Sequence, residues 1–120
     1  MIRKFLILAA LFVFGFCAGA QAQETQFFSG LSDIPLMEGL EELPEQGVHF
    51  DKPEGRVVEA VALMDSVAQP AVAAYYLNTL PQFGWSRIAD QDYIRQGEKL
   101  HLSFEENEGH LFFKILISPR

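Results

Sequence analysis

Cysteine is almost absent from this chain, since Cys17 is the only one among its 120 residues. It lies in a leading segment that we expect to be removed, so the mature chain has neither a disulfide nor a thiol nucleophile. No serine sits in a Gly-x-Ser-x-Gly elbow either, which removes the usual signal of a serine hydrolase. We therefore predict that the protein is not an enzyme and carries no cofactor.

An apolar run long enough to cross a bilayer is also missing. The longest run, residues 5–16, follows Arg3 and Lys4 and precedes Ala20-Gln21-Ala22. A membrane helix needs about 20 apolar residues, whereas this pattern is typical of a secretory signal peptide over residues 1–22. We predict cleavage near Ala22 and a periplasmic or secreted product without membrane contact. Lipidation of Cys17 is the alternative, and the bulky Phe16 before it disfavours that route.

Basic residues are scarce after residue 22, where the chain has 7 basic and 16 acidic residues. This balance disfavours nucleic acid or anionic lipid as a partner. Solubility is the simplest reason for the acidity, and a basic partner is the alternative. The length suits a single small domain.

Residues 23–46 show no lasting period and are interrupted by Pro35, Gly39 and Pro44. We predict an irregular stretch packed on the domain. Asp33 is a candidate cap for a short helix with Pro35 in its first turn. The face of that helix would hold Leu36, Leu40 and Leu43.

Residues 47–119 contain patterns that are typical of β-strands and of one helix. Residues 48–50 and 56–64 predict a hairpin around Lys52-Pro53-Glu54-Gly55, with the second strand central because it is apolar on both faces. Ser66 and Gln69 match a capping box for a helix over 67–80. Pro81 and Gly84 would end that helix, whose apolar face is formed by Val72, Tyr76, Leu80 and Phe83.

Four strand-like runs follow, at residues 85–89, 92–96, 99–105 and 110–118. Placing Glu105 opposite His110 pairs Leu102 with Phe113 and puts the apolar residues on one face. The fold class is therefore α+β, one helix packed on a curved antiparallel sheet, in the order ββαββββ. Phe112 and Leu116 fall on the other face, which we expect to be covered by Phe27, Phe28 and Leu31 or by a second copy.

The run Tyr76-Leu77-Asn78-Thr79-Leu80-Pro81-Gln82-Phe83-Gly84-Trp85 carries an aromatic, three residues, Leu-Pro, two residues and Gly-Trp. Together with the strands up to Lys99-Leu100, this pattern resembles small exported bacterial proteins of unassigned function. The resemblance covers residues 47–119. It implies the fold and an envelope location, and it implies no catalytic residue.

Few residues are candidates for a functional site. Arg87 and Arg95 lie on neighbouring strands with side chains on one face and are candidates for an anion contact, with salt bridges to Asp90, Asp92 or Glu98 as the alternative. Phe112 and Leu116 are candidates for a binding surface. His49, His101 and His110 fall too far apart for a metal site, which needs ligands within about 2.1 Å of one point.

These features support two functional hypotheses of different classes. The first is an exported, non-catalytic module of the bacterial cell envelope that binds a protein or peptide, as a monomer or homodimer. The alternative is a small-ligand-binding protein or hydrolase with a site between the helix and the N-terminal stretch, near Tyr75 and Arg95. The arrangement also resembles the cystatin inhibitors, but their Gln-Val-Gly loop is absent.

Overall fold

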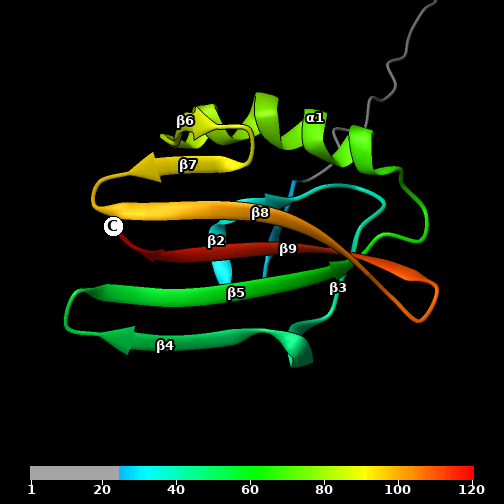
Figure 1. Ribbon diagram of the computed structural model, residues 1–120, viewed down its shortest axis with the longest axis horizontal. Helices are drawn as coiled ribbons and strands as arrows, with labels where there is room; N and C mark the ends of the chain where they lie inside the picture. The colour runs from blue at the N-terminus through cyan, green and yellow to red at the C-terminus, as the bar shows by residue number, and fades with distance from the viewer. Residues whose placement is uncertain (1–24) are drawn as a thin grey trace, which may run out of the picture.

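The computed structural model describes residues 25–120, so the predicted signal peptide, Cys17 and the predicted cleavage near Ala22 lie outside the described residues. One helix lies against an antiparallel sheet of seven strands (Figure 1). The sheet order is β3-β5-β9-β8-β7-β6, and β4 also pairs with β5. The bounds are β1 Gln26–Phe28, β2 Leu31–Leu36, β3 Glu41–Glu42, η1 Pro44–Gln46, β4 Val48–Lys52, β5 Gly55–Leu63, α1 Gln69–Thr79, η2 Leu80–Phe83, β6 Ser86–Ala89, β7 Asp92–Arg95, β8 Glu98–Asn107 and β9 His110–Pro119.

The predicted α+β class is confirmed, but the predicted order is incomplete. Six strands and the helix follow Gly47 in the order expected, whereas β1, β2 and β3 precede them. The β4–β5 hairpin turns between Lys52 and Gly55, and β5 has strands on both sides. The central position predicted for β5 is therefore confirmed.

The N-terminal stretch is more regular than its sequence indicates, and the helix predicted after Asp33 is wrong. β1 and β2 form an antiparallel ribbon, which buries Phe28, Leu31 and Ile34. Pro35 is tolerated because a two-stranded ribbon has free edges on which no amide is needed. Asp33 makes an ion pair instead of capping a helix.

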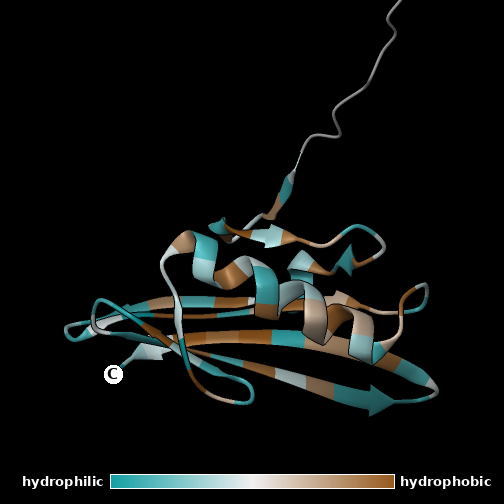
Figure 2. Ribbon diagram, turned by 90° about the horizontal axis from the view of Figure 1, so that it is seen from above, coloured by the Kyte–Doolittle hydropathy of each residue, from teal (hydrophilic) through white to brown (hydrophobic). Residues whose placement is uncertain are grey.

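This ribbon lies on the same side of the sheet as α1 (Figure 2). The expectation that it covers Phe112 and Leu116 is therefore wrong. A helix is about 10 Å wide, whereas six neighbouring strands span roughly 25 Å at about 4.8 Å each. One helix cannot cover that width, so the N-terminal ribbon covers the remainder of the same face.

The helix is confirmed, although its predicted capping box is wrong. Ala68 is the N-cap and no side chain caps the helix. Ser66 lies two residues too early because Gln69 is already helical. Val72, Tyr76 and Leu80 are fully buried as predicted. The chain leaves the following 3-10 turn through Gly84, whose φ is 92° and whose N–H donates to the carbonyls of Leu80 and Pro81.

The β8–β9 pairing has the predicted parity, but the predicted register is wrong by two residues. Glu105 lies opposite Phe112, and Leu102 lies opposite Ile115. The difference arises because the turn contains only Glu108 and Gly109, both at positive φ of 52° and 82°, as in the tight hairpin turns that match strand twist. A shift of two keeps every side chain on its face.

Candidate functional site

The outer face of the sheet, the one away from α1, carries an apolar surface. The pairings put Val48 and Phe50 of β4 on the outer face beside β5. Phe50, Val48 and Leu116 are 49%, 46% and 36% exposed. Further outer-face residues are half-buried, namely Val57, Leu63 and Phe112. The structure thus keeps two of the predicted surface residues, Phe112 and Leu116, together on one face.

One row across the outer face combines apolar and acidic side chains. Glu41 lies opposite Leu63, Leu63 opposite Phe112, and Phe112 opposite Glu105. Lys114 Nζ lies 2.7 Å from Glu105 Oε1, and this hydrogen bond raises the pKa of Lys114 above its usual value. Glu41 has no ion-pair partner within residues 25–120.

Arg87 and Arg95 lie on the opposite face from Phe112 and Leu116. Arg87 pairs in register with Tyr93, whose side chain is buried in the core, and Arg95 follows on the same side of β7. Arg87 Nη2 lies 3.0 Å from Asp90 Oδ1. The predicted surface residues therefore form two separate groups, one on each face of the sheet.

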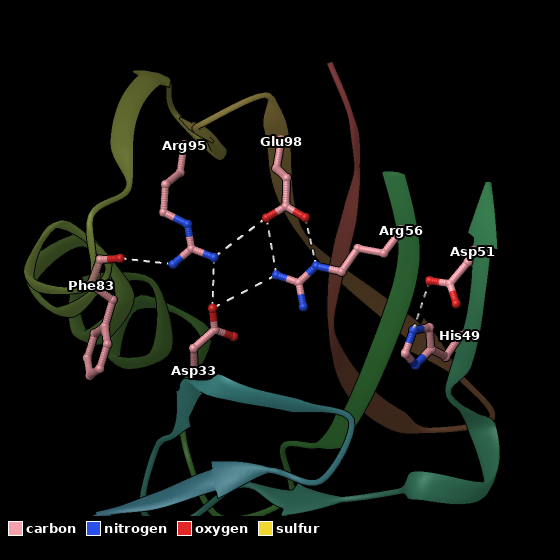
Figure 3. Close-up of polar contacts among 7 residues, drawn as sticks. All are labelled: Asp33, His49, Asp51, Arg56, Phe83, Arg95 and Glu98. Carbon is pink, nitrogen blue, oxygen red and sulfur yellow. Dashed lines mark hydrogen bonds and ion pairs between the residues drawn. The ribbon is translucent and has the colours of Figure 1, made fainter. Parts of the chain in front are cut away.

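Arg95 belongs to an inner-face ion network with Arg56, Glu98 and Asp33 (Figure 3). The guanidinium of Arg56 donates two hydrogen bonds to the Glu98 carboxylate, from Nε to Oε2 at 2.7 Å and from Nη2 to Oε1 at 3.1 Å. Arg95 Nη2 donates to Asp33 Oδ2 at 2.7 Å, and its Nη1 donates to the Phe83 carbonyl at 3.0 Å. The hydrogen bond with Glu98 raises the pKa of Arg56.

This network joins four strands, since Arg56 lies on β5. Asp33 comes from the N-terminal ribbon, Glu98 from β8 and Arg95 from β7, where its guanidinium lies 4.3 Å from the ring centroid of Trp85. Two arginines and two carboxylates balance in charge, and their side chains are 18% to 39% exposed. The salt bridge of Arg95 with Glu98, the alternative to an anion contact, is present at 3.5 Å.

Sequence reasoning missed Asp33 and Arg56 as members of this network. Asp33 is 62 residues from Arg95, and Arg56 is 42 residues from Glu98. No local pattern signals pairs so far apart. The sequence indicates only that the Arg95 side chain lies on the same face of its strand as Tyr93.

Two cavities lie near the residues named for the alternative function. One of about 570 Å³ lies between the helix and the N-terminal stretch, lined by Tyr75 together with Thr25, Gln26, Leu36, Met37, Glu38, Gly39 and Leu40. Another of about 410 Å³ is lined by Arg95 with Phe83, Gly84, Ser86, Ile94 and Gln96. Tyr75 and Arg95 therefore line different cavities.

Each histidine lies beside an aspartate. His101 Nδ1 is 2.8 Å from Asp92 Oδ1, and His110 Nδ1 is 3.2 Å from Asp65 Oδ1. The corrected register places His101 opposite Leu116 and His110 opposite Asn107. Within the described part of the chain, no three or more His, Cys, Asp or Glu side chains are grouped to hold a metal ion.

Comparisons with protein-family models, with curated proteins and with solved structures find no match to this chain. The resemblance carried by residues 76–85 therefore stays a prediction. Over residues 25–120, no helix has the length and hydropathy that a membrane crossing requires.

Proposed function

We propose that this protein is an exported, non-catalytic module of the bacterial cell envelope that binds another protein through the outer face of its sheet. The observation that supports the proposal is the apolar surface around Phe112 and Leu116. Antiparallel sheets with one open face normally place polar side chains there. Here, β4, β5 and β9 place apolar side chains on that face beside a few charged ones, and Phe50 and Val48 are close to half exposed.

Exposed apolar patches with a polar rim are typical of protein interaction sites. Glu41 and Glu105 flank the Leu63 and Phe112 pair at one end. Glu105 is bound to Lys114, so Glu41 is the carboxylate of this row that is open to a basic partner. The chain after residue 22 is also strongly acidic as a whole. The partner that this surface fits is an amphipathic protein segment with apolar residues flanked by lysine or arginine.

The inner face supports the non-catalytic part of the proposal. Catalytic groups need a concave site in which charged side chains face a substrate. The arginines and carboxylates of the inner face instead bind one another and a backbone carbonyl. Their charges are used to hold the N-terminal ribbon on the sheet.

A pull-down from an envelope extract with matched variants tests the proposal. Phe112→Asp and Leu116→Asp place a charge on the outer face, whereas Leu77→Asp places the same charge on the helix, where Leu77 is 44% exposed. Circular dichroism checks that each variant folds. We expect the two outer-face variants to lose a partner that wild type and Leu77→Asp retain. Identical partner lists for all four proteins would refute the proposal.

The cavity beside Tyr75 supports a second candidate, the binding of a small ligand that has both apolar and polar groups. Its lining combines the apolar side chains of Leu36, Met37 and Leu40 with polar ones, including the carboxylate of Glu38. Leu36→Trp would fill this cavity, and Leu77→Trp is the control on the exposed helix face. Ligand-observed NMR with a fragment library should show hits that Leu36→Trp removes. Absence of any hit sensitive to Leu36→Trp would end this candidate.

A further inference from the structure

The two edges of the sheet differ in how they are protected. β4 and β6 form opposite edges (Figure 1). The register of β6 with β7 is irregular between Arg87 and Ala89, and such irregularities protect an edge from pairing with another strand. β4 pairs with β5 through five residues without any shift, and all five residues of β4 are exposed. β4 is therefore the edge open to a further strand.

We infer that β4 pairs with β4 of a second copy of this chain, in an antiparallel arrangement about a two-fold axis perpendicular to the sheet. The inference uses the backbone edge of β4, which carries Val48 and Phe50 of the outer face, and it does not use Phe112 or Leu116. An exposed, regular edge strand offers a row of unpaired backbone donors and acceptors. Two-fold pairing satisfies them with identical groups of the second copy.

The side chains of β4 select one register. With Phe50 on the axis, His49 of each copy lies opposite Asp51 of the other, and Val48 lies opposite Lys52. With Asp51 on the axis, two carboxylates would face each other, and with His49 on the axis, two imidazoles would. Opposite charges facing each other across strands stabilise a pair, and like charges destabilise it. The sequence Val48-His49-Phe50-Asp51-Lys52 is thus complementary to itself.

The side chains of His49 and Asp51 are accessible for this contact. His49 Nε2 and Asp51 Oδ1 are 3.8 Å apart within one chain, and their side chains are 56% and 86% exposed. Figure 3 shows both on β4, where Asp51 lies opposite Arg56 of β5, whose guanidinium is directed to Glu98. In the dimer, Phe50 meets Phe50 of the second copy, and the two outer faces join into one continuous face. The contact is small, so the dimer is weak and concentration-dependent.

Sedimentation velocity on the mature chain, with two complementary variants, tests this pairing. His49→Asp alone places two pairs of carboxylates in opposition, and Asp51→Lys alone replaces the pairing charge by a cation. Each variant should raise the dimer Kd about tenfold. In a mixture of the two variants, the carboxylate introduced by His49→Asp faces the ammonium introduced by Asp51→Lys, and the second pair is the native one. The mixture should therefore form a heterodimer about as stable as the wild-type dimer.

Recovery on mixing cannot arise from the His49–Asp51 contact within one chain, because neither variant regains that contact. A wild-type chain that stays monomeric up to millimolar concentration would overturn the inference, as would a dimer that both single variants leave unchanged. Circular dichroism confirms that the variants fold. Partner capture through Phe112 is unaffected by either result, so the failure of this inference and the failure of the proposed function are distinguishable.

Discussion

The two faces of the central sheet carry similar apolar residues but differ in what covers them. On the inner face, Phe113 and Ile115 are fully buried beneath the helix and the N-terminal ribbon (Figure 2). On the outer face, their neighbours Phe112 and Leu116 remain in part accessible. Apolar character alone therefore does not distinguish a core residue from a surface residue. The two are distinguished by whether the helix and the N-terminal ribbon cover that face of the sheet.

The largest expected effect contrasts two adjacent phenylalanines. Phe113→Ala should lower the free energy of unfolding by about 3 to 5 kcal/mol, because it opens a cavity in the core. Phe112→Ala should lower it by only about 1 kcal/mol, because its ring is already partly hydrated and leaves no closed cavity. Urea unfolding followed by tryptophan fluorescence measures both. Similar losses for the two variants would remove the distinction between the faces.

A smaller effect tests whether the inner-face ion network holds the N-terminal ribbon. Glu98→Ala leaves Arg56 without its two short hydrogen bonds and should cost about 2 kcal/mol, less than a fully buried pair because the network is partly exposed. Asp90→Ala removes the ion-pair partner of Arg87. The Asp90 carboxylate is fully open to solvent, so this variant should change stability little. Equal effects in thermal unfolding would show that the network has no special role.

The Tyr76 hydroxyl, which joins the helix to the N-terminal ribbon, should make the free energy of unfolding depend on pH. Its hydroxyl donates to the Pro35 carbonyl at 2.6 Å and accepts from the Met37 N–H at 3.2 Å, so Tyr76→Phe should cost about 1 kcal/mol at pH 7. Burial raises the pKa of Tyr76. Because the unfolded tyrosine ionises first, at about pH 10, its contribution is present below that pH and is lost as pH rises further.

Urea unfolding between pH 9 and pH 11 measures this loss. Wild type should lose stability more steeply than Tyr76→Phe above about pH 10, and the two proteins should converge. Parallel curves would mean that the Tyr76 hydroxyl is not held in a dry site between the helix and the ribbon.

The smallest effect concerns the outer face. Lys114 and Glu105 form an ion pair whose side chains are 28% and 57% exposed, so Lys114→Met should change stability by less than about 1 kcal/mol. The salt dependence of stability should flatten slightly in the variant, because the exposed pair is screened by ions. A large loss in chemical unfolding would mean that this pair supports the fold as the inner network does.

The sequence was sufficient for the elements whose signal is local. The spacing of Val72, Tyr76 and Leu80 predicts the buried face of α1, and strand parity places Phe112 and Leu116 on the outer face. The length of the β8–β9 turn could not be predicted, because residues 106–109 suit either a four-residue or a two-residue turn. The positive φ of Glu108 in the structure shows that the turn is the short one. The N-terminal stretch was predicted to pack on the domain, but its two strands and the face that it covers were not, because the covered face depends on the width of the sheet rather than on a sequence period.

The candidate site was predictable only in part, for the same reason. Phe112 and Leu116 follow from parity on one strand, whereas Asp33 and Arg95 meet through the tertiary fold. Ion pairs between distant segments leave no spacing in the sequence. The sequence suggests the bridge of Arg95 with Glu98, whereas the bond of Arg95 with Asp33 emerges from the structure alone.

Site-specific photocrosslinking in intact cells shows whether the open outer face is the binding surface. A photoreactive phenylalanine analogue is placed at Phe112, at Leu116 or, as control, at the exposed helix residue Leu77. We expect the two outer-face positions to give the same crosslinked protein and Leu77 not to give it. Crosslinks to that protein from Leu77 alone, or equally from all three positions, would contradict this expectation.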